Sequence, residues 1–112
     1  MRNIPLITLS YDELKCLVID CIKKHGNSFE FKNFCNTVGA MAVRKEIVPN
    51  PNPINYQTIY FPLQKENENT VRQILWDLIV DRFLTIGDYH NDTWPWLSVT
   101  EKGKRILQDL ES

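Results

Sequence analysis

Four side chains that could hydrogen-bond to the edges of DNA bases lie close together in the sequence, at Asn69, Thr70, Arg72 and Gln73. In the major groove the guanidinium group of arginine suits guanine, and the amide of glutamine suits adenine. Helices that read DNA make such contacts from their first turns. The same residue types also suit the solvated first turn of an ordinary helix, so both interpretations stay open at this point.

Further candidates for DNA contact follow later in the chain. His90 and Asn91 lie at the tip of a polar turn, between the carboxylates of Asp88 and Asp92. The nearest basic side chains, which could position the protein on phosphates, are Lys102, Lys104 and Arg105. Lys23-Lys24 and Arg44-Lys45 are two more basic pairs. Solvated surface would explain each of these basic groups equally well.

A second apolar stripe on the helix that carries the first four candidates indicates a covered surface. Trp76, Val80 and Phe83 lie away from its predicted core side, and a helix that is apolar on two sides is normally buried on both. The cover could come from the loop at 54–63, from the segment at 4–9, or from a homodimer or another protein partner. The last alternative makes these three residues candidates for an interface.

Trp94 is a fourth candidate for a protein interface. It lies two residues before Trp96, so the two side chains share one face of a predicted strand. They could cover the sheet, or they could bind a protein, because tryptophan is enriched among the residues that dominate interfaces.

Catalytic and metal-binding patterns are absent from the sequence. No nucleophile motif, phosphate-binding loop or dinucleotide-binding glycine pattern occurs, so we expect no enzyme, no catalytic residue and no cofactor. Cys21, His25 and Cys35 could converge on zinc, but no fourth ligand is apparent, and buried cysteines are common without metal. We therefore expect no metal site, and we expect Cys16 to be exposed.

The composition is that of an ordinary globular protein. Of the 112 residues, 43% are apolar and 24% are charged, and no apolar run is long enough to span a membrane. The cysteines fit reduced thiols and no signal peptide is visible, so we expect a cytoplasmic protein without membrane contact. The net charge of −1 weakens the case for DNA, because phosphate binding usually requires a basic excess.

The elements that position these residues are predicted from local signals. Ser10 and Glu13 form a capping box at the start of a helix over 11–25. In the next helix Gly39 indicates a close helix crossing or a bend. The other expected elements are a short strand near 28–31, the second helix over about 32–46, an ordered proline- and aromatic-rich loop at 48–66 with a short strand at 57–61, a third helix from Asn67 or Asn69 to about 83, a hairpin of 84–86 and 94–99, and a last helix capped by Thr100.

The second half of the chain carries a recognisable order of elements. A predicted helix and strand over 70–86 precede a polar turn, and the stretch 97–107 then contains Val99-Thr100-Glu101-Lys102-Gly103 with Ile106-Leu107. This part resembles winged-helix regulators of the PadR and MarR kind, in which a recognition helix, a strand, a wing, a second strand and an LTxxGxxLL helix start follow one another. The similarity covers residues 67–110 well, and residues 10–46 at the level of helix order.

The resemblance implies an α+β, mostly helical fold over 1–112: a winged helix-turn-helix with a three-helix core, a two- to three-stranded β-wing and a C-terminal helix. Two features depart from that pattern. About twenty residues separate the second and third helices, where such regulators have a short turn. The third helix also carries Asp77 and Asp81, which would repel phosphate if they faced it.

Two functions fit these observations. The first is a dimeric transcriptional regulator whose third helix enters the major groove of double-stranded DNA. The second is a winged-helix module that binds proteins and does not bind DNA. A continuous positive surface beside the start of the third helix favours DNA, whereas a mixed or negative surface with Trp76 or Trp94 exposed favours a protein partner.

Overall fold

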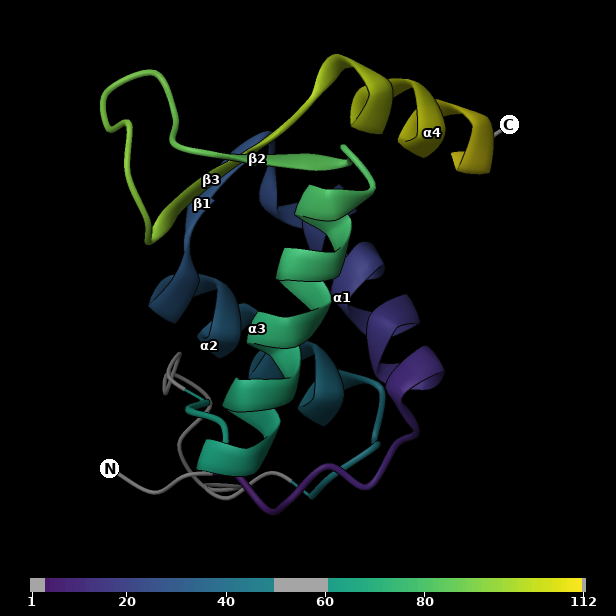
Figure 1. The fold of residues 1–112 in the computed structure, drawn as a ribbon. Coiled ribbons are helices and arrows are strands. Elements are labelled where there is room, and N and C mark those ends of the chain that lie inside the picture. The colour runs from purple at the N-terminus through teal and green to yellow at the C-terminus, as the bar shows by residue number, and fades with distance from the viewer. Residues whose placement is uncertain (1–3, 50–60, 112) are drawn as a thin grey trace.

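The computed structural model describes residues 4–49 and 61–111, which form a mostly helical α+β fold (Figure 1). Its elements are α1 (Tyr11–His25), β1 (Ser28–Glu30), α2 (Phe31–Arg44), α3 (Lys65–Val80), β2 (Leu84–Ile86), β3 (Trp96–Val99) and α4 (Glu101–Glu111). The sheet lies across one end of the three helices α1, α2 and α3, and α4 extends to one side of it (Figure 1). None of the described helices is long and apolar enough to cross a membrane.

Helix α1 begins and ends where the sequence predicts. The Ser10 hydroxyl accepts a hydrogen bond from the Glu13 backbone N–H (3.2 Å), and the Glu13 carboxylate accepts one from the Ser10 N–H (3.0 Å). This confirms the capping box, and the bond from the Ser10 backbone lowers the pKa of Glu13. The residues that α1 buries against the core are the predicted stripe of Leu14, Leu17, Val18, Cys21 and Ile22.

Helix α2 ends at Arg44, two residues before the predicted end, and its glycine meets a loop. A Cβ atom on Gly39 would lie 2.0 Å from the carbonyl oxygen of Phe61. The glycine does allow a close backbone approach, but the predicted helix crossing was wrong, because the neighbour is the backbone just before α3. Phe61 and the buried Leu63 pack against the core, while residues 50–60, including most of the strand predicted at 57–61, lie outside the described part of the chain.

Helix α3 begins at Lys65, so the prediction of a cap at Asn67 or Asn69 was wrong, as was the extension of the loop to 66. Asn67 is buried in the first turn of the helix, and its side chain bonds to the backbone of Ile7. The Asn67 amide oxygen accepts from the Ile7 N–H (2.8 Å), and its amide nitrogen donates to the Ile7 carbonyl (3.0 Å). The N-terminal segment is thereby fastened to α3.

The strands form a three-stranded antiparallel sheet in the order β1-β3-β2. Leu84 pairs with Val99 and Ile86 with Leu97, which confirms the predicted hairpin. On its other side β3 pairs with β1, where Phe29 lies opposite Leu97. Trp94 lies outside β3, so it does not share a strand face with Trp96 as predicted.

Thr100 and Gly103 join α4 to the end of α3. The Thr100 hydroxyl accepts from the Gly103 N–H (2.9 Å) and donates to the Arg82 carbonyl (2.5 Å). A Cβ atom on Gly103 would lie 2.3 Å from the Phe83 carbonyl oxygen. The predicted cap at Thr100 and the close backbone approach at Gly103 are both present.

We expect Gly39→Ala to destabilise the protein, because the added methyl group would collide with the Phe61 carbonyl and the backbone must move. The expected loss of unfolding free energy is about 1–3 kcal/mol, measured by urea denaturation followed by circular dichroism. Helix propensity alone predicts the opposite sign, a gain of about 1 kcal/mol for replacing glycine in a helix. Ala40→Gly, at the next position, measures that propensity effect, and a more stable Gly39→Ala variant would contradict the close contact.

Asn67→Asp should destabilise the fold by about 3 kcal/mol at neutral pH, because it buries a carboxylate next to the Ile7 carbonyl and removes a donor. Burial raises the pKa of such a carboxyl above its unfolded value of about 3.9. The loss should therefore be smallest below that pH, where the protonated acid can donate again, and should grow as the pH rises through the folded pKa. Urea denaturation at acid and neutral pH checks this. Asn69→Asp, on the half-buried side of the same helix, should change the unfolding free energy little. Equal effects of the two variants would disprove the role of the Asn67–Ile7 hydrogen bonds.

Candidate interaction surfaces

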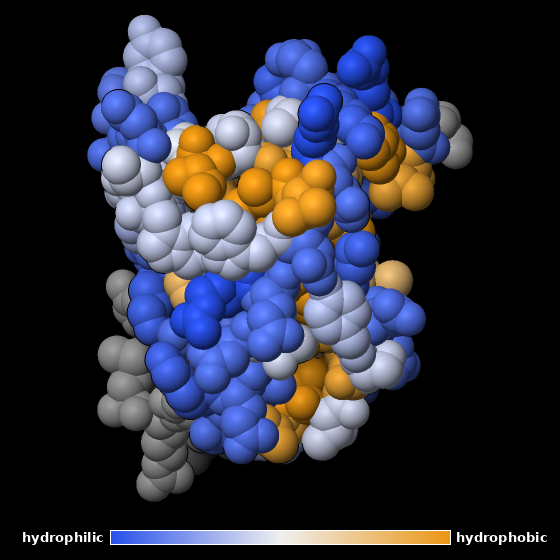
Figure 2. Space-filling model, in the orientation of Figure 1, coloured by the Kyte–Doolittle hydropathy of each residue, from blue (hydrophilic) through white to orange (hydrophobic). Residues whose placement is uncertain are grey.

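The outer side of α3 carries the ridge that helical periodicity predicts. Arg72, Gln73, Trp76 and Val80 are exposed along it, and Val80 is 78% exposed. In Figure 2 apolar and neutral surface gathers over the sheet and the C-terminal end of α3, whereas the N-terminal half of α3 is mostly hydrophilic. The two halves of the helix therefore present different chemistry.

Bonds within the protein engage most of the proposed base-reading side chains. The Arg72 guanidinium donates to the Asn69 amide oxygen (3.1 Å), and the Thr70 hydroxyl donates to the Glu66 carbonyl (3.1 Å). Asn69 and Thr70 are half-buried, while Arg72 and Gln73 are exposed. The sequence placed these four residues in the first turns, but the earlier start of α3 at Lys65 moves them to its second and third turns.

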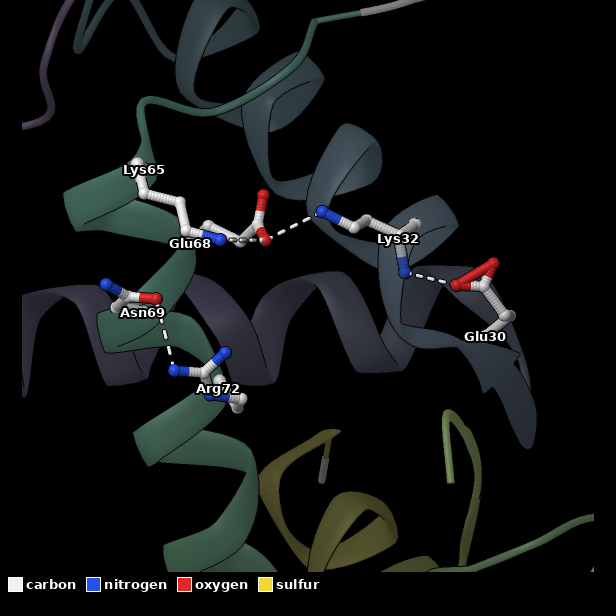
Figure 3. Close-up of polar contacts among 6 residues, drawn as sticks. All are labelled: Glu30, Lys32, Lys65, Glu68, Asn69 and Arg72. Carbon is white, nitrogen blue, oxygen red and sulfur yellow. Dashed lines mark hydrogen bonds and ion pairs between the residues drawn. The ribbon is translucent and has the colours of Figure 1, made fainter. Parts of the chain in front are cut away.

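Ion pairs give the N-terminal half of α3 a mixed charge. The Glu68 carboxylate lies 2.7 Å from the Lys32 ammonium of α2 and 3.6 Å from that of Lys65 (Figure 3). The hydrogen bond from Lys32 lowers the pKa of Glu68. Lys32 also donates its backbone N–H to the Glu30 carboxylate (Figure 3). Among the described residues, carboxylates therefore interrupt the positive charge beside the start of this helix.

An aromatic pair occupies the C-terminal half of the ridge. Trp76 stacks on Trp94, with ring centroids 5.6 Å apart and planes inclined by 20°, and Trp94 in turn contacts Phe31 (5.2 Å). Trp76 is 42% exposed. Phe83 is buried, which corrects its place in the predicted stripe: α3 ends at Val80, and the turn at Arg82, with φ of 63°, directs the chain inward.

Two exposed carboxylates follow Trp76 and Val80 along the helix. Asp77 and Asp81 are exposed on α3 beside Trp76 and Val80, and Asp77 accepts a hydrogen bond from the Tyr11 hydroxyl of α1. That bond, together with slight burial and the nearby negative charges, raises the pKa of Tyr11 to about 12. We call Trp76, Asp77, Val80, Asp81 and Trp94 the acidic–aromatic face.

The turn between β2 and β3 adds no positive charge. His90 is exposed and Asn91 half-buried, and their backbone N–H groups donate to the Asp88 carboxylate (2.9 and 2.8 Å). The turn contains no lysine or arginine, and Tyr89 at its tip is 94% exposed. His90 and Asn91, which the sequence predicts to contact DNA, thus lie in a turn whose backbone is held by the Asp88 carboxylate.

Basic side chains gather instead around the C-terminal end of α1. Lys23, Lys104 and Arg105 line a hollow of about 460 Å³ between α1 and α4. Lys24, His25 and Arg44 line a second hollow of about 250 Å³ between α1 and α2. We call Lys23, Lys104 and Arg105, around the first hollow, the basic face. Lys102 lines neither hollow. Its ammonium group donates to the Asp81 carbonyl (3.0 Å), and it shares a third hollow with Arg105.

The cysteines do not form a metal site with the described residues. Cys16 is exposed, as predicted, while burial raises the pKa of both Cys21 and Cys35 to about 12 and keeps these thiols protonated. His25 packs against the rings of Phe29 and Phe34. Within 4–49 and 61–111, no group of three His, Cys, Asp or Glu side chains is placed to hold a metal ion.

The Tyr11–Asp77 bond should be visible in an alkaline titration. Because the folded pKa of about 12 lies above the usual value of 10, the bond stabilises the fold fully below about pH 10 and its contribution is lost as the pH rises towards 12. Phenolate absorbance should therefore show a phase near pH 12 that is missing in Tyr11→Phe and moves to lower pH in Asp77→Asn. Tyr89→Phe, on the exposed turn, is the control, and an unchanged late phase in Tyr11→Phe would refute the bond.

Comparison with known proteins adds no relative: no family profile, no curated protein sequence and no solved structure matches this chain.

Proposed function

We propose that this chain is a winged-helix domain that binds a protein partner through its acidic–aromatic face. The order of its elements supports the winged-helix part: a hairpin follows the third helix, and its second strand also pairs with a short strand between α1 and α2. The Thr100–Gly103 start of α4 adds the motif on which the resemblance to PadR- and MarR-type regulators rests.

The observation that carries the proposal is the partly exposed Trp76–Trp94 stack beside the exposed Val80. Stacking holds the Trp76 ring in place, so little side-chain entropy is lost when a partner covers it. Tryptophan in such a position is typical of the few residues that dominate interface energies. Asp77 and Asp81 at the edge supply charge that would orient a partner and exclude competing anions.

Base reading by α3, the other function that the sequence allows, has less support. Arg72 is bonded to Asn69, Glu66 and Glu68 share the start of the helix, and the β2–β3 turn carries carboxylates. Phosphates approaching α3 would meet Asp77 and Asp81 near its other end. These charges favour a partner other than DNA at this face.

The test first passes an extract of the source cells over the immobilised chain and isolates the protein that is retained. Calorimetry then measures the affinity of the chain for this isolated binder. Trp76→Ala should raise the dissociation constant of the complex with this binder about thirtyfold, which is the effect expected of a residue that dominates an interface. Val80→Asp should raise it at least as much. Leu110→Asp on α4 places the same charge at another exposed apolar position (57% exposed) and should leave binding unchanged.

Equal affinities of Trp76→Ala, Val80→Asp and Leu110→Asp would refute the proposal. The base-reading function would be established instead if a duplex selected from random DNA bound the wild type tightly and did not bind Arg72→Ala or Gln73→Ala.

A further inference from the structure

The third hollow lies where the end of α3, the strand β2 and the start of α4 meet, and we call it the junction hollow. Its volume of about 540 Å³ is in the range of sites that hold small molecules. Ile79, which is half-buried, and the buried Leu84 give it apolar surface, and Thr85 and Thr100 also line it. The other lining residues are charged: Arg82, Glu101, Lys102 and Arg105.

Most of the positive charge in the junction hollow is available to a ligand. Arg82 and Arg105 are exposed and form no ion pair with any residue in the described part of the chain. Lys102 donates one hydrogen bond to a backbone carbonyl, which leaves two of its three ammonium donors. Glu101 lies 3.3 Å from the ammonium group of Lys104, which does not line this hollow. Three cations therefore face one carboxylate whose charge is already matched from outside.

The backbone of Arg82 indicates that its side chain has a role of its own. Its φ of 63° lies in the left-handed region, which costs free energy for a residue with a Cβ atom and which glycine adopts freely. A glycine would make the same turn between α3 and β2 without that cost. Strained positions of this kind cluster at sites that bind ligands, and here the strained residue contributes a guanidinium group to the hollow.

The charge and the size of the junction hollow indicate the kind of anion that fits it. A phosphate monoester carries a charge of about −1.5 to −2 at neutral pH, and guanidinium groups bind phosphate oxygens through paired hydrogen bonds. A carboxylate carries a single charge and would leave more of the positive charge unmatched. Inorganic phosphate would match the charge, but it is too small to cover Ile79 and Leu84 as well.

The exposed side chains of the hollow favour a soluble ligand over a lipid in a membrane. Proteins that bind membrane surfaces combine basic residues with exposed apolar side chains that insert into the bilayer. In the junction hollow the exposed residues are all polar or charged, whereas both apolar residues are at least half-buried.

We propose that the junction hollow binds a small soluble phosphate monoester with an apolar substituent. Arg82, Lys102 and Arg105 hold the phosphate group, and Ile79 and Leu84 contact the substituent. The hollow shares no residue with the acidic–aromatic face. Its ligand binding needs no protein partner, so this proposal can be tested independently of the proposed function.

The experiment titrates hexyl phosphate into the isotope-labelled protein and follows the backbone amide signals by nuclear magnetic resonance. We expect saturable binding with a dissociation constant of about 1 mM or lower, and the largest shifts at residues 79–85 and 100–105. Inorganic phosphate, which lacks the apolar part, and hexanoate, which lacks the second charge, should each bind at least about tenfold more weakly.

Variants of the two arginines test the assigned roles. Arg82→Gln and Arg105→Gln should each raise the dissociation constant of hexyl phosphate at least about tenfold. Arg44→Gln is the matched control, because it removes the same charge from the hollow between α1 and α2 and should bind like the wild type. Since Arg105 is exposed on α4, its variant suffices if Arg82→Gln does not fold.

Each of four results would overturn the proposal. The first is the absence of saturable binding by the wild type, and the second is equal weakening in Arg44→Gln and Arg105→Gln. The third is binding of hexanoate as tightly as hexyl phosphate. The fourth is binding to vesicles that contain phosphatidic acid without binding to hexyl phosphate, which would identify a membrane lipid as the ligand.

Discussion

The junction at Thr100 holds together the parts on which both candidate surfaces depend. Its hydroxyl donates to the carbonyl of Arg82 while accepting from the N–H of Gly103, and its own N–H donates to the Phe83 carbonyl (3.1 Å). One residue thus satisfies the carbonyls at the turn after α3 and caps α4. Because Val80 and Asp81 precede this turn and Lys104 and Arg105 follow the cap, the junction sets where each surface lies.

Local signals were sufficient for most of the fold. The capping box at Ser10, the hairpin of 84–86 with 97–99, and the Thr100–Gly103 start of α4 are patterns of neighbouring residues, and each is present. The start of α3 could not be read in this way. Asn67 has the residue type of a helix cap, but its amide is used by the backbone of Ile7, sixty residues away in the chain.

The candidate surfaces were predictable to different degrees for the same reason. Helical periodicity of about 100° per residue places Trp76 and Val80 on the outer side of α3, and both are exposed. It also placed Phe83 there, because nothing in the sequence showed that the helix ends at Val80. The basic face depends on the packing of α4 beside α1. The pattern of charges along the chain therefore could not predict that Lys23 and Arg105 line the same hollow.

The Asn67 side chain acts towards Ile7 as a neighbouring strand would, with one donor and one acceptor for one residue's backbone. Ile7 belongs to no helix or strand, yet its amide hydrogen lies in a buried bond of the kind that shields sheet amides from solvent. Hydrogen–deuterium exchange at this amide should therefore be as slow as within the sheet. It would report on how often the N-terminal segment lifts away from α3, a motion that backbone secondary structure alone would not reveal.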